Sequence, residues 1–322
     1  MRNIKKVLPI AIGGAVAAVG AAAVDGTIKL LMNEALDREE PKIFQKNKSA
    51  ITGGFNESDV FKSGKDAAMV LREKVTCRVE ILSRSGDKLV GHWYPCEGAK
   101  RVVLAMHGWR SKWYRDFGAS ADFWHNNGCS ILYAEQRGQG ESGGEVMGFG
   151  ITERFDCLDW LDWIENNTDE NLPIYLAGIS MGATTVLMAA GLPLPQRVHG
   201  VMADCGFTSP EAIWRHVAKD NLHIPYDLLR RPIDRMCRRK IGCGPGDDST
   251  VAAMQRCTTP VLLIHGTDDS FVPLDMTLQN YQACAAPCRL LVVPGADHGV
   301  SYLVNREGYE AAVKEFWDEF DQ

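Results

Sequence analysis

The sequence lacks the patterns by which zinc proteins and nucleic-acid-binding proteins are recognised. No two of its 10 cysteines are spaced as CxxC and its 8 histidines form no HxxxH pair, so we expect no metal site. The formal net charge of -6 leaves no excess of lysine and arginine for phosphate contacts, and nucleic acid is therefore not an expected partner. Internal repeats are absent as well. What remains is an ordinary globular composition, 45% hydrophobic, with no expected cofactor.

The N-terminus has the layout of an exported protein. Three basic residues precede residues 7–24, which contain no charged side chain, and this arrangement is typical of an export signal. Small residues near its end suit cleavage, but its length also reaches the lower limit of a membrane span, and residues 27–36 continue in a helical pattern. We therefore expect residues 1–25 to be a signal or a membrane anchor. Either alternative makes the protein extracytoplasmic, secreted or associated with a membrane through this segment.

The cysteines do not decide the compartment by themselves. Ten are many for a cytosolic protein and are compatible with disulfides outside the cell. Cys129, Cys157 and Cys205 fall inside predicted strands or helices, where we expect buried thiols. Two pairs are close enough in sequence to form disulfides, although spacing does not fix connectivity: Cys237 with Cys243, and Cys284 with Cys288.

From about residue 76 the sequence alternates between strand-like and helix-like segments. Short apolar runs with the length of strands buried on both faces occur at residues 102–106, 131–134, 174–177, 198–203, 261–264 and 290–293. Between two of these runs, residues 152–165 place apolar side chains along one helical face, with Thr152 as the expected N-cap. This alternation predicts an α/β fold, with a mostly parallel central sheet and helices on both faces.

Segments outside this alternation of strands and helices indicate how the chain is divided into an extension and a main domain. Residues 77–82 and 88–94 are predicted strands joined by the turn SRSGD, which would add an antiparallel edge to the sheet. Residues 26–75 are expected to form a helical or irregular extension. The main domain then spans residues 76–322, and the stretch of about 206–259 between two strands is long enough for a small helical cap.

One serine stands at a junction that suits a nucleophile. Ser180 lies in GISMG, between the strand-like residues 174–177 and the helix-like residues 183–190. A sharp strand-to-helix turn needs small flanking residues and lifts the serine hydroxyl above the sheet, as in the GxSxG nucleophile elbow. The same pattern also occurs in turns without chemistry, so a catalytic role for Ser180 requires partners.

Residues that suit those partners follow in the required order. The segment VLLIHGTDDSFVP contains a strand that opens into a loop with Asp268 and Asp269, and His298 lies in the loop after the last strand. Both loops follow the carboxyl ends of predicted parallel strands, where sites in open α/β sheets are built. The chain order Ser, Asp, His is that of the α/β-hydrolases.

With these motifs the sequence resembles the α/β-hydrolase superfamily over about residues 75–322. The segments that carry the resemblance are MHGW, YAEQRGQGES, GISMG, IHGTDDSFVP and GADHG. More narrowly, it is similar to the membrane-anchored serine-aminopeptidase-like (S33-type) hydrolases of Gram-positive bacteria, in which RFDCLDWLDWI at residues 154–164 has close counterparts. The resemblance implies the α/β-hydrolase fold and its acyl-transfer chemistry more firmly than it implies a substrate.

The resemblance also implies a role for each residue of the site. Ser180 would attack an acyl carbonyl, His298 would take its proton, and Asp269 would hold the imidazole in the right tautomer. The loop pattern of the family selects Asp269 over Asp268. Asp204 is a competing acid, because some members of the superfamily recruit one from that strand, but we interpret it as a carboxylate that stabilises its loop.

Other residues near these motifs receive supporting roles. The oxyanion hole is expected to consist of the backbone N–H groups of Trp109 and Met181. His107 and His265 are each followed by glycine at a strand end, and we interpret them as structural. The glycine-rich EQRGQGES has no lysine followed by serine or threonine, as a P-loop would require, so three of its residues are interpreted as structural too: Arg137, Gly138 and Gly140.

Substrate choice is expected to depend on the insertion at about 206–259. Its aromatic residues suit an acyl or aryl group. Its basic stretch, residues 230–240, suits an acidic substrate, anionic lipid head groups or simply a solvated helix face. The candidate pocket residues, of which the first two could equally belong to the core, are Trp113, Tyr114, Phe207, Trp214 and Tyr226.

Three functions fit the motifs. Hydrolysis of a carboxylic ester through an acyl-enzyme is the leading hypothesis, because the Ser, His and Asp set is complete and no device for recognising a peptide terminus is recognisable. Amide or peptide hydrolysis by the same residues is the alternative, and in both cases the partner is a small-molecule ester or amide. A non-catalytic binding protein on the same fold is the third hypothesis. The acyl group, the leaving group and the oligomeric state stay open.

Overall fold

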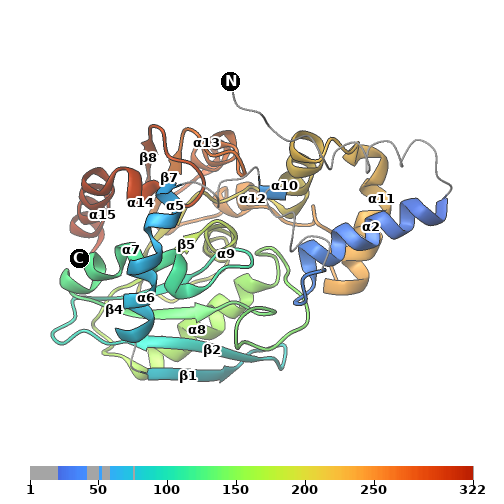
Figure 1. Ribbon diagram of the computed structural model, residues 1–322. Helices are drawn as coiled ribbons and strands as arrows, with labels where there is room; N and C mark the ends of the chain where they lie inside the picture. The colour runs from blue at the N-terminus through green and yellow to red at the C-terminus, as the bar shows by residue number, and fades with distance from the viewer. Residues whose placement is uncertain (1–20, 42–50, 53–58, 75–76, 322) are drawn as a thin grey trace.

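The computed structural model describes residues 21–41, 51–52, 59–74 and 77–321 (Figure 1). Residues 1–20, which make up most of the expected signal or anchor, lie outside this part of the chain. Among the described residues, no helix combines the length and the apolar character that crossing a bilayer requires.

Eight strands form one sheet in the order β1-β2-β4-β3-β5-β6-β7-β8. Strand β2 is antiparallel to both β1 and β4, and all other neighbours are parallel. The predicted parallel sheet and its antiparallel edge are thus confirmed. The strands are β1 (Cys77–Leu82), β2 (Lys88–Tyr94), β3 (Arg101–Met106), β4 (Cys129–Glu135), β5 (Ile174–Ile179), β6 (Val198–Asp204), β7 (Val261–Gly266) and β8 (Cys288–Val293).

Helices cover both faces of the sheet (Figure 1). Those in the main domain are α7 (Trp113–Asn126), α8 (Glu153–Asn167), α9 (Met181–Ala190), α12 (Thr250–Met254), α13 (Leu274–Ala283), α14 (Ser301–Val304) and α15 (Arg306–Phe320). The extension contributes α2 (Ala21–Leu36), α5 (Asp59–Ser63) and α6 (Lys65–Lys74), and the insertion after β6 contributes α10 (Pro210–His216), the π-helix η2 (Val217–Asn221) and α11 (Tyr226–Ile241).

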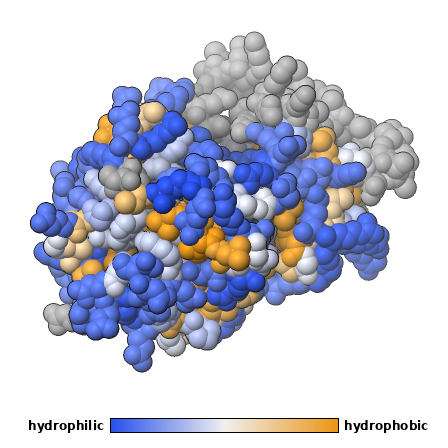
Figure 2. Space-filling view, turned by 90° about the horizontal axis from the view of Figure 1, so that it is seen from below, coloured by the Kyte–Doolittle hydropathy of each residue, from blue (hydrophilic) through white to orange (hydrophobic). Residues whose placement is uncertain are grey.

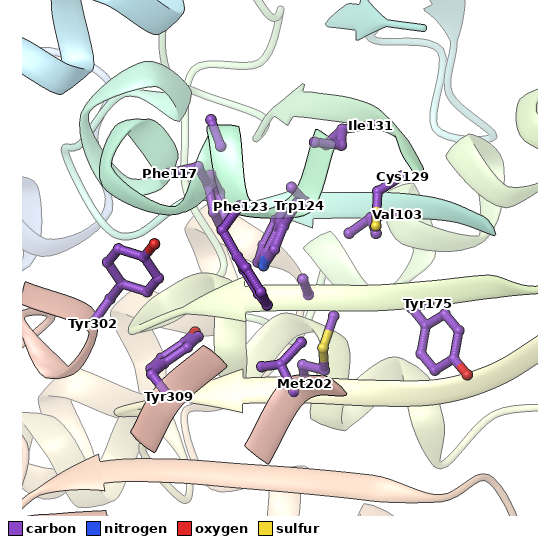
Figure 3. Packing of buried hydrophobic residues seen from close by; sticks show 14 of the residues in the cluster. Val103, Phe117, Phe123, Trp124, Cys129, Ile131, Tyr175, Met202, Tyr302 and Tyr309 are labelled. Carbon is purple, nitrogen blue, oxygen red and sulfur yellow. The ribbon is translucent and has the colours of Figure 1, made fainter. Parts of the chain in front are cut away.

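The core consists of two apolar layers, one on each side of the sheet. Alternate residues of β3 belong to different layers, because successive side chains of a strand point to opposite faces. Val103 and Ala105 pack with residues of α7 and α15, whereas Val102 and Leu104 pack with residues of α8 and α9. Figure 3 shows the first layer, in which the aromatic rings of α7 lie against the strands.

Helix α8 begins differently from the way the sequence indicates. Thr152 occupies the N-cap position, as predicted, but its side chain makes no capping hydrogen bond, so the predicted capping by Thr152 was wrong. The buried carboxylate of Glu153 instead accepts the N–H groups of Gly148 and Gly150, at 2.5 and 2.9 Å. An acid in the first turn also suits the positive end of the helix dipole.

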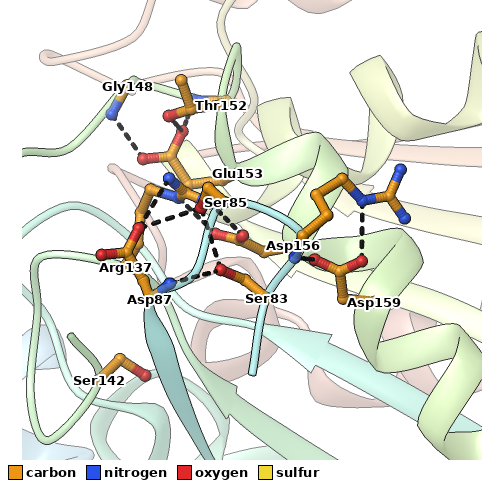
Figure 4. A network of polar contacts seen from close by, with 12 residues as sticks. Ser83, Ser85, Asp87, Arg137, Ser142, Gly148, Thr152, Glu153, Asp156 and Asp159 are labelled. Atoms are coloured by element: carbon orange, nitrogen blue, oxygen red, sulfur yellow. Dashed lines mark hydrogen bonds and ion pairs between the residues drawn. The ribbon is translucent and has the colours of Figure 1, made fainter. Parts of the chain in front are cut away.

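The glycine-rich loop after β4 is held by contacts with neighbouring residues of the protein. Gly138, Gly140 and Gly143 do have the GxGxxG spacing of dinucleotide-binding loops, but no helix begins there, as such a loop would require. Arg137 donates to Asp156 of α8 at 2.6 Å, within a network of polar contacts (Figure 4). A Cβ atom at Gly140 would lie 1.7 Å from Glu135 Oε2. These contacts agree with a structural role for the loop.

Helix α2 packs against the insertion and lies beside α11 (Figure 1). Ile28, Met32 and Leu36 on one face of α2 share an apolar cluster with residues of α10 and α11. Helix α11 contains the basic stretch of the insertion, residues 230–240. Two of its arginines form ion pairs: Arg230 with Glu211 at 2.6 Å and Arg238 with Asp247 at 2.7 Å.

The face shown in Figure 2 is mainly hydrophilic, with apolar residues near its middle and in smaller groups elsewhere. No disulfide joins any two of the 10 cysteines, all of which lie in the described part of the chain. The three thiols expected to be buried are buried: Cys129, Cys157 and Cys205.

Candidate active site

Ser180 lies in a strained turn between β5 and α9. Its φ of 57° and ψ of -118° place a non-glycine residue in a region that L side chains rarely adopt. The turn is closely packed on both sides: a Cβ atom at Gly178 would lie 2.3 Å from the backbone of Gly182, and one at Gly182 would lie 1.8 Å from Met106 O. The sequence GISMG folds in this way because only glycine fits at those two positions.

Three loops bring their polar side chains together at the carboxyl ends of β5, β7 and β8. His298 Nε2 lies 2.8 Å from Ser180 Oγ, and His298 Nδ1 lies 2.8 Å from Asp269 Oδ2. Ser180 and His298 are only 6% and 4% exposed. The three residues selected from the sequence therefore form one continuous chain of hydrogen bonds, in a position where little water competes for them.

The carboxylate of Asp269 is surrounded by donors. Its Oδ1 accepts the N–H groups of Phe271 and Val272 at 3.0 and 2.8 Å, and its Oδ2 lies 3.2 Å from His265 Nε2 in addition to the contact with His298. Burial alone would raise the pKa of Asp269, but the two histidines and their hydrogen bonds hold that pKa below its usual range. Asp269 is therefore a charged acceptor for the imidazole.

The imidazole of His298 is tuned by the same contact. Burial alone would lower the pKa of His298, but the negative charge of Asp269 and the hydrogen bond to it hold that pKa above the ordinary value of 6.5. A ring with Nδ1–H directed at Asp269 presents Nε2 to the hydroxyl of Ser180. This is the tautomer that a general base needs.

The two competing acids lie elsewhere. Asp268 is exposed, and its carboxylate accepts the hydroxyl of Thr267 at 2.8 Å. Asp204 is buried and accepts the hydroxyl of Ser301 at 3.0 Å, and burial raises the pKa of Asp204 to about 6. Neither carboxylate contacts His298 through a hydrogen bond, so the structure places Asp269 alone at that position.

The two His-Gly histidines are fully engaged in packing. His107 joins the loops after β3 and β4, because its Nε2 accepts the N–H of Gln136 at 3.2 Å, and burial lowers the pKa of His107. His265 Nδ1 lies 2.7 Å from Thr277 Oγ1 and its Nε2 lies 2.9 Å from Val272 O. His265 also contacts Asp269, which makes it a positioning residue for the acid.

Two backbone donors near Ser180 are not used within the described structure. The N–H groups of Trp109 and Met181 make no hydrogen bond with any described residue. Met181 is the first residue of α9, where N–H groups have no partner inside the helix. The loop that carries Trp109 is fixed by Asp116, whose carboxylate accepts the N–H of Gly108 at 2.7 Å.

A cavity of about 100 Å³ opens onto the hydroxyl of Ser180. Trp109 and Phe271 form part of its wall, and they also line a second, apolar cavity toward α2 and the insertion. Of the predicted pocket residues, Trp214 and Tyr226 line this second cavity. A period-3.6 apolar pattern in residues 28–35 was the one signal that could have added α2 to the predicted pocket.

The other three pocket predictions find different surroundings. Trp113 is buried in the core, with its ring 4.3 Å from that of His92. Tyr114 borders a separate cavity on the far side of Ile179, and Phe207 packs 5.8 Å from Phe149. These aromatic rings fill space between elements and do not line the cavity at Ser180, so the sequence-based assignment was wrong for them.

Among the described residues, the one cluster of potential metal-ligand atoms is the site itself, Cys205 with Asp269 and His298. Both ring nitrogens of His298 already have partners in Ser180 and Asp269. Burial also raises the pKa of the Cys205 thiol, which disfavours the thiolate that a metal ion would need. The cluster is better explained by proton transfer than by metal binding.

Comparisons with known proteins find hydrolases of the same fold. A family model described as serine aminopeptidase, S33, matches residues 97–222, which include Ser180. The uncharacterized protein YqkD of Bacillus subtilis is 28% identical over 191 residues, which span 59% of this chain and only 63% of that relative. The esterase Pf2001 of Pyrococcus furiosus has a TM-score of 0.64 at 21% identity and covers 80% of this chain and 94% of its own. Est1E of Butyrivibrio proteoclasticus has a TM-score of 0.55 at 19% identity, covering 76% and 98%.

The fold is therefore that of the α/β hydrolases. The strand order and the strained turn at Ser180 agree with this fold. Over residues 97–222 it is similar to the serine aminopeptidases of family S33.

Proposed function

We propose that the protein hydrolyses carboxylic esters through an acyl-enzyme formed on Ser180. The observation that carries the proposal is the chain of two 2.8 Å hydrogen bonds that joins Ser180 Oγ, His298 and Asp269. The names of the similar structures, among them an esterase of Pyrococcus furiosus, support the choice of substrate class.

The reaction follows from the positions of the protons. Ser180 Oγ attacks the carbonyl carbon while its proton passes to His298 Nε2, and Asp269 stabilises the imidazolium that forms. The carbonyl oxygen becomes negative and is stabilised by the N–H groups of Trp109 and Met181. Collapse of this intermediate breaks the ester bond, and the alcohol leaves with the proton from His298. A water molecule then gives its proton to the same imidazole, attacks the acyl group and releases the acid and Ser180.

The test uses a fluorophosphonate probe and p-nitrophenyl esters. Wild-type protein is expected to be labelled at Ser180 and to hydrolyse the esters, and Ser180→Ala is expected to lose labelling and about six orders of magnitude in kcat. Ser63→Ala, in which an exposed hydroxyl of α5 is removed, is the matched control and should behave like wild type. A Ser180→Ala protein that is still labelled, or a wild type that is not, would refute the proposal and favour a non-catalytic binding protein.

Amide or peptide hydrolysis is the second candidate, favoured by the description of the matching family as serine aminopeptidase. The same residues can perform it, because only the leaving group differs. Aminoacyl p-nitroanilides compared with p-nitrophenyl esters separate the two candidates. A larger kcat/KM for the anilides, after correction for the faster spontaneous hydrolysis of the esters, would assign the enzyme to the peptidases.

Export of the protein remains a proposal that rests on the sequence alone. The support is the uncharged stretch at residues 7–24 after three basic residues. Fractionation of cells that produce the full chain, with N-terminal sequencing of the product, tests it. We expect the protein in the membrane or outside the cytoplasm. An intact chain recovered in the soluble cytoplasmic fraction would contradict this.

A further inference from the structure

We propose that the apolar cavity between α2, the insertion and Trp109 binds the acyl chain of the substrate and selects chains of medium length. This inference rests on the proposed ester hydrolysis. It assigns to the N-terminal extension a part in substrate recognition, although that extension lies outside the main domain.

The walls of the cavity are mainly apolar and come from several separate parts of the chain. The one acidic residue among them, Glu34, pairs with Arg110 at 3.6 Å. Helix α2 contributes Leu31, Met32 and Ala35, and the insertion contributes residues such as Trp214 and Leu222. Phe149, from the loop before α8, adds an aromatic ring 5.1 Å from that of Trp214. Apolar surface of this kind gains free energy when it exchanges water for hydrocarbon, which matches an alkyl chain better than a polar group.

The apolar cavity is a neighbour of the cavity at Ser180. Trp109 and Phe271 line both this cavity and the one that opens onto Ser180. The ring of Phe271 lies 5.1 Å from the imidazole of His298, and the backbone N–H of Trp109 is one of the two donors expected at the carbonyl oxygen. In the proposal, a chain attached to the carbonyl carbon passes beside these two shared aromatic residues into the apolar cavity.

The leaving group has a different, more polar surface available. The lining of the first cavity, unlike that of the apolar cavity, includes Ser111, Arg115 and Asp116. The oxygen of the leaving group takes its proton from His298 as the ester bond breaks, and the alcohol that forms remains near polar side chains. This division places the acyl chain, not the alcohol, in the apolar cavity.

Helix α2 is attached firmly enough to serve as a wall. The indole N–H of Trp109 donates to Ala35 O at 2.9 Å. Arg110 Nη2 donates to Glu34 O and Asp37 O at 2.7 and 2.8 Å. The carbonyls of Glu34 and Ala35 belong to the last turn of α2, where no partner exists inside the helix, and Asp37 directly follows the helix. The residues that end the helix are thus held by the same loop that provides the expected oxyanion donor.

The size of the cavity sets the expected chain length. Its volume is about 90 Å³, which at roughly 15 Å³ for each water-sized atom accommodates about six non-hydrogen atoms. Acyl chains of about six to eight carbons should therefore fit best. Below that length each buried methylene should raise kcat/KM about fourfold, and longer chains should gain nothing further.

The experiment measures kcat/KM for p-nitrophenyl esters from acetate to dodecanoate with the full chain. Wild type should peak at about six to eight carbons. Ala218 lines the cavity, and Ala218→Trp should lower the ratio of octanoate to acetate hydrolysis at least tenfold. Its neighbour Lys219 is exposed on the same π-helix, so Lys219→Trp should keep the wild-type ratio. Trp214→Ala enlarges the cavity and should move the peak to longer chains, which keeps the test decisive if Ala218→Trp does not fold.

The outcomes separate this inference from the proposed function. Labelling of Ser180 together with a flat profile, or with a profile that Ala218→Trp and Trp214→Ala leave unchanged, would overturn the acyl-chain assignment and leave the esterase intact. A parallel series of alkyl acetates tests the direction of binding: an increase with alcohol length that Ala218→Trp abolishes would place the leaving group in the cavity instead. Absence of both labelling and hydrolysis would refute the proposed function itself.

Discussion

Asp269 accepts hydrogen bonds from two backbone N–H groups as well as from His298, and this fixes the orientation of its carboxylate. A carboxylate that is already oriented costs nothing to reorganise when the imidazole beside it becomes charged. The neighbouring Asp268 lacks these contacts and faces solvent. At the scale of single residues, the site therefore depends on which of two adjacent, chemically identical side chains points inward.

Replacing each of the two aspartates by alanine in turn tests the assignment of the acid. Asp269→Ala should lower kcat by about three to four orders of magnitude, because the imidazole loses its partner and its tautomer. Asp268→Ala should change kcat by less than about threefold, since an exposed side chain is removed. Steady-state kinetics with p-nitrophenyl hexanoate measures both. Comparable losses in the two variants would contradict the assignment.

The pH dependence follows from the contact between His298 and Asp269. The neutral imidazole is the active form, so kcat/KM should fall as the pH falls through the pKa of His298, which Asp269 holds above 6.5. Asp269→Asn removes the negative charge, so the remaining activity should reach half its maximum at a lower pH than in wild type. A pH profile of kcat/KM tests this, and an unchanged midpoint would show that another group controls the acid limb.

The sequence was sufficient for part of the site only. Ser180 and His298 could be predicted because the elbow and the loop after the last strand have local signatures. The choice between Asp268 and Asp269 needed the loop pattern of a family, since neither composition nor spacing distinguishes two adjacent acids. The contact of His265 with Asp269 could not be foreseen, because it depends on how far the loop after β7 folds back over its own strand.

The elbow is the element in which backbone packing matters most. Gly182→Ala should destabilise the fold by more than about 3 kcal/mol, because its Cβ atom would lie 1.8 Å from Met106 O and no side chain can move away. Gly26→Ala is the control, because nothing lies within 4 Å of the added atom in the exposed part of α2, and it should stabilise the protein by up to about 1 kcal/mol. Urea unfolding measures both free energies, and a stable, soluble Gly182→Ala protein would contradict this account of the turn.

At the scale of elements, strands were easier to predict than pockets. The five central strands, β3 to β7, are buried and appear in the sequence as short apolar runs, which is a local property. The edge strand β8 has a similar run although it is only half-buried. A pocket depends on which side of an element faces a cavity. Trp113 and Trp214 are equally aromatic in sequence, but Trp113 packs from the start of α7 against Tyr133 of β4, whereas Trp214 lines a cavity together with residues of α2. Local patterns contain no information about that difference.

Across the whole molecule, the end of the chain is attached to the centre of the sheet. Asp321, just after α15, forms an ion pair with Arg101 at the start of β3 and accepts the hydroxyl of Tyr175 at 2.9 Å. The guanidinium of Arg101 also lies 4.4 Å from the ring of Trp317. Because Arg101 is buried, its charge depends on a partner that is far away in sequence.

Removal of that partner should therefore affect the stability of the entire fold. Asp321→Asn should lower the free energy of unfolding by about 2–3 kcal/mol, since a buried guanidinium loses its counter-charge while part of the hydrogen bonding remains. Asp318→Asn, on the exposed side of α15, should change it by less than about 0.5 kcal/mol. Urea unfolding followed by circular dichroism gives both values. Equal effects would mean that the ion pair contributes nothing beyond surface charge.

Helix α2 and its attachment have a consequence for the order of events during synthesis. The helix ends at Leu36, but the loop that binds its last carbonyls begins at residue 109. Lys240, which pairs with Asp37, lies 203 residues after Asp37 in the chain. Domains fold as the chain emerges from the ribosome, N-terminal residues first. Helix α2 must therefore wait for most of the polypeptide before its docking surface exists, so the cavity that we propose for the acyl chain is completed last.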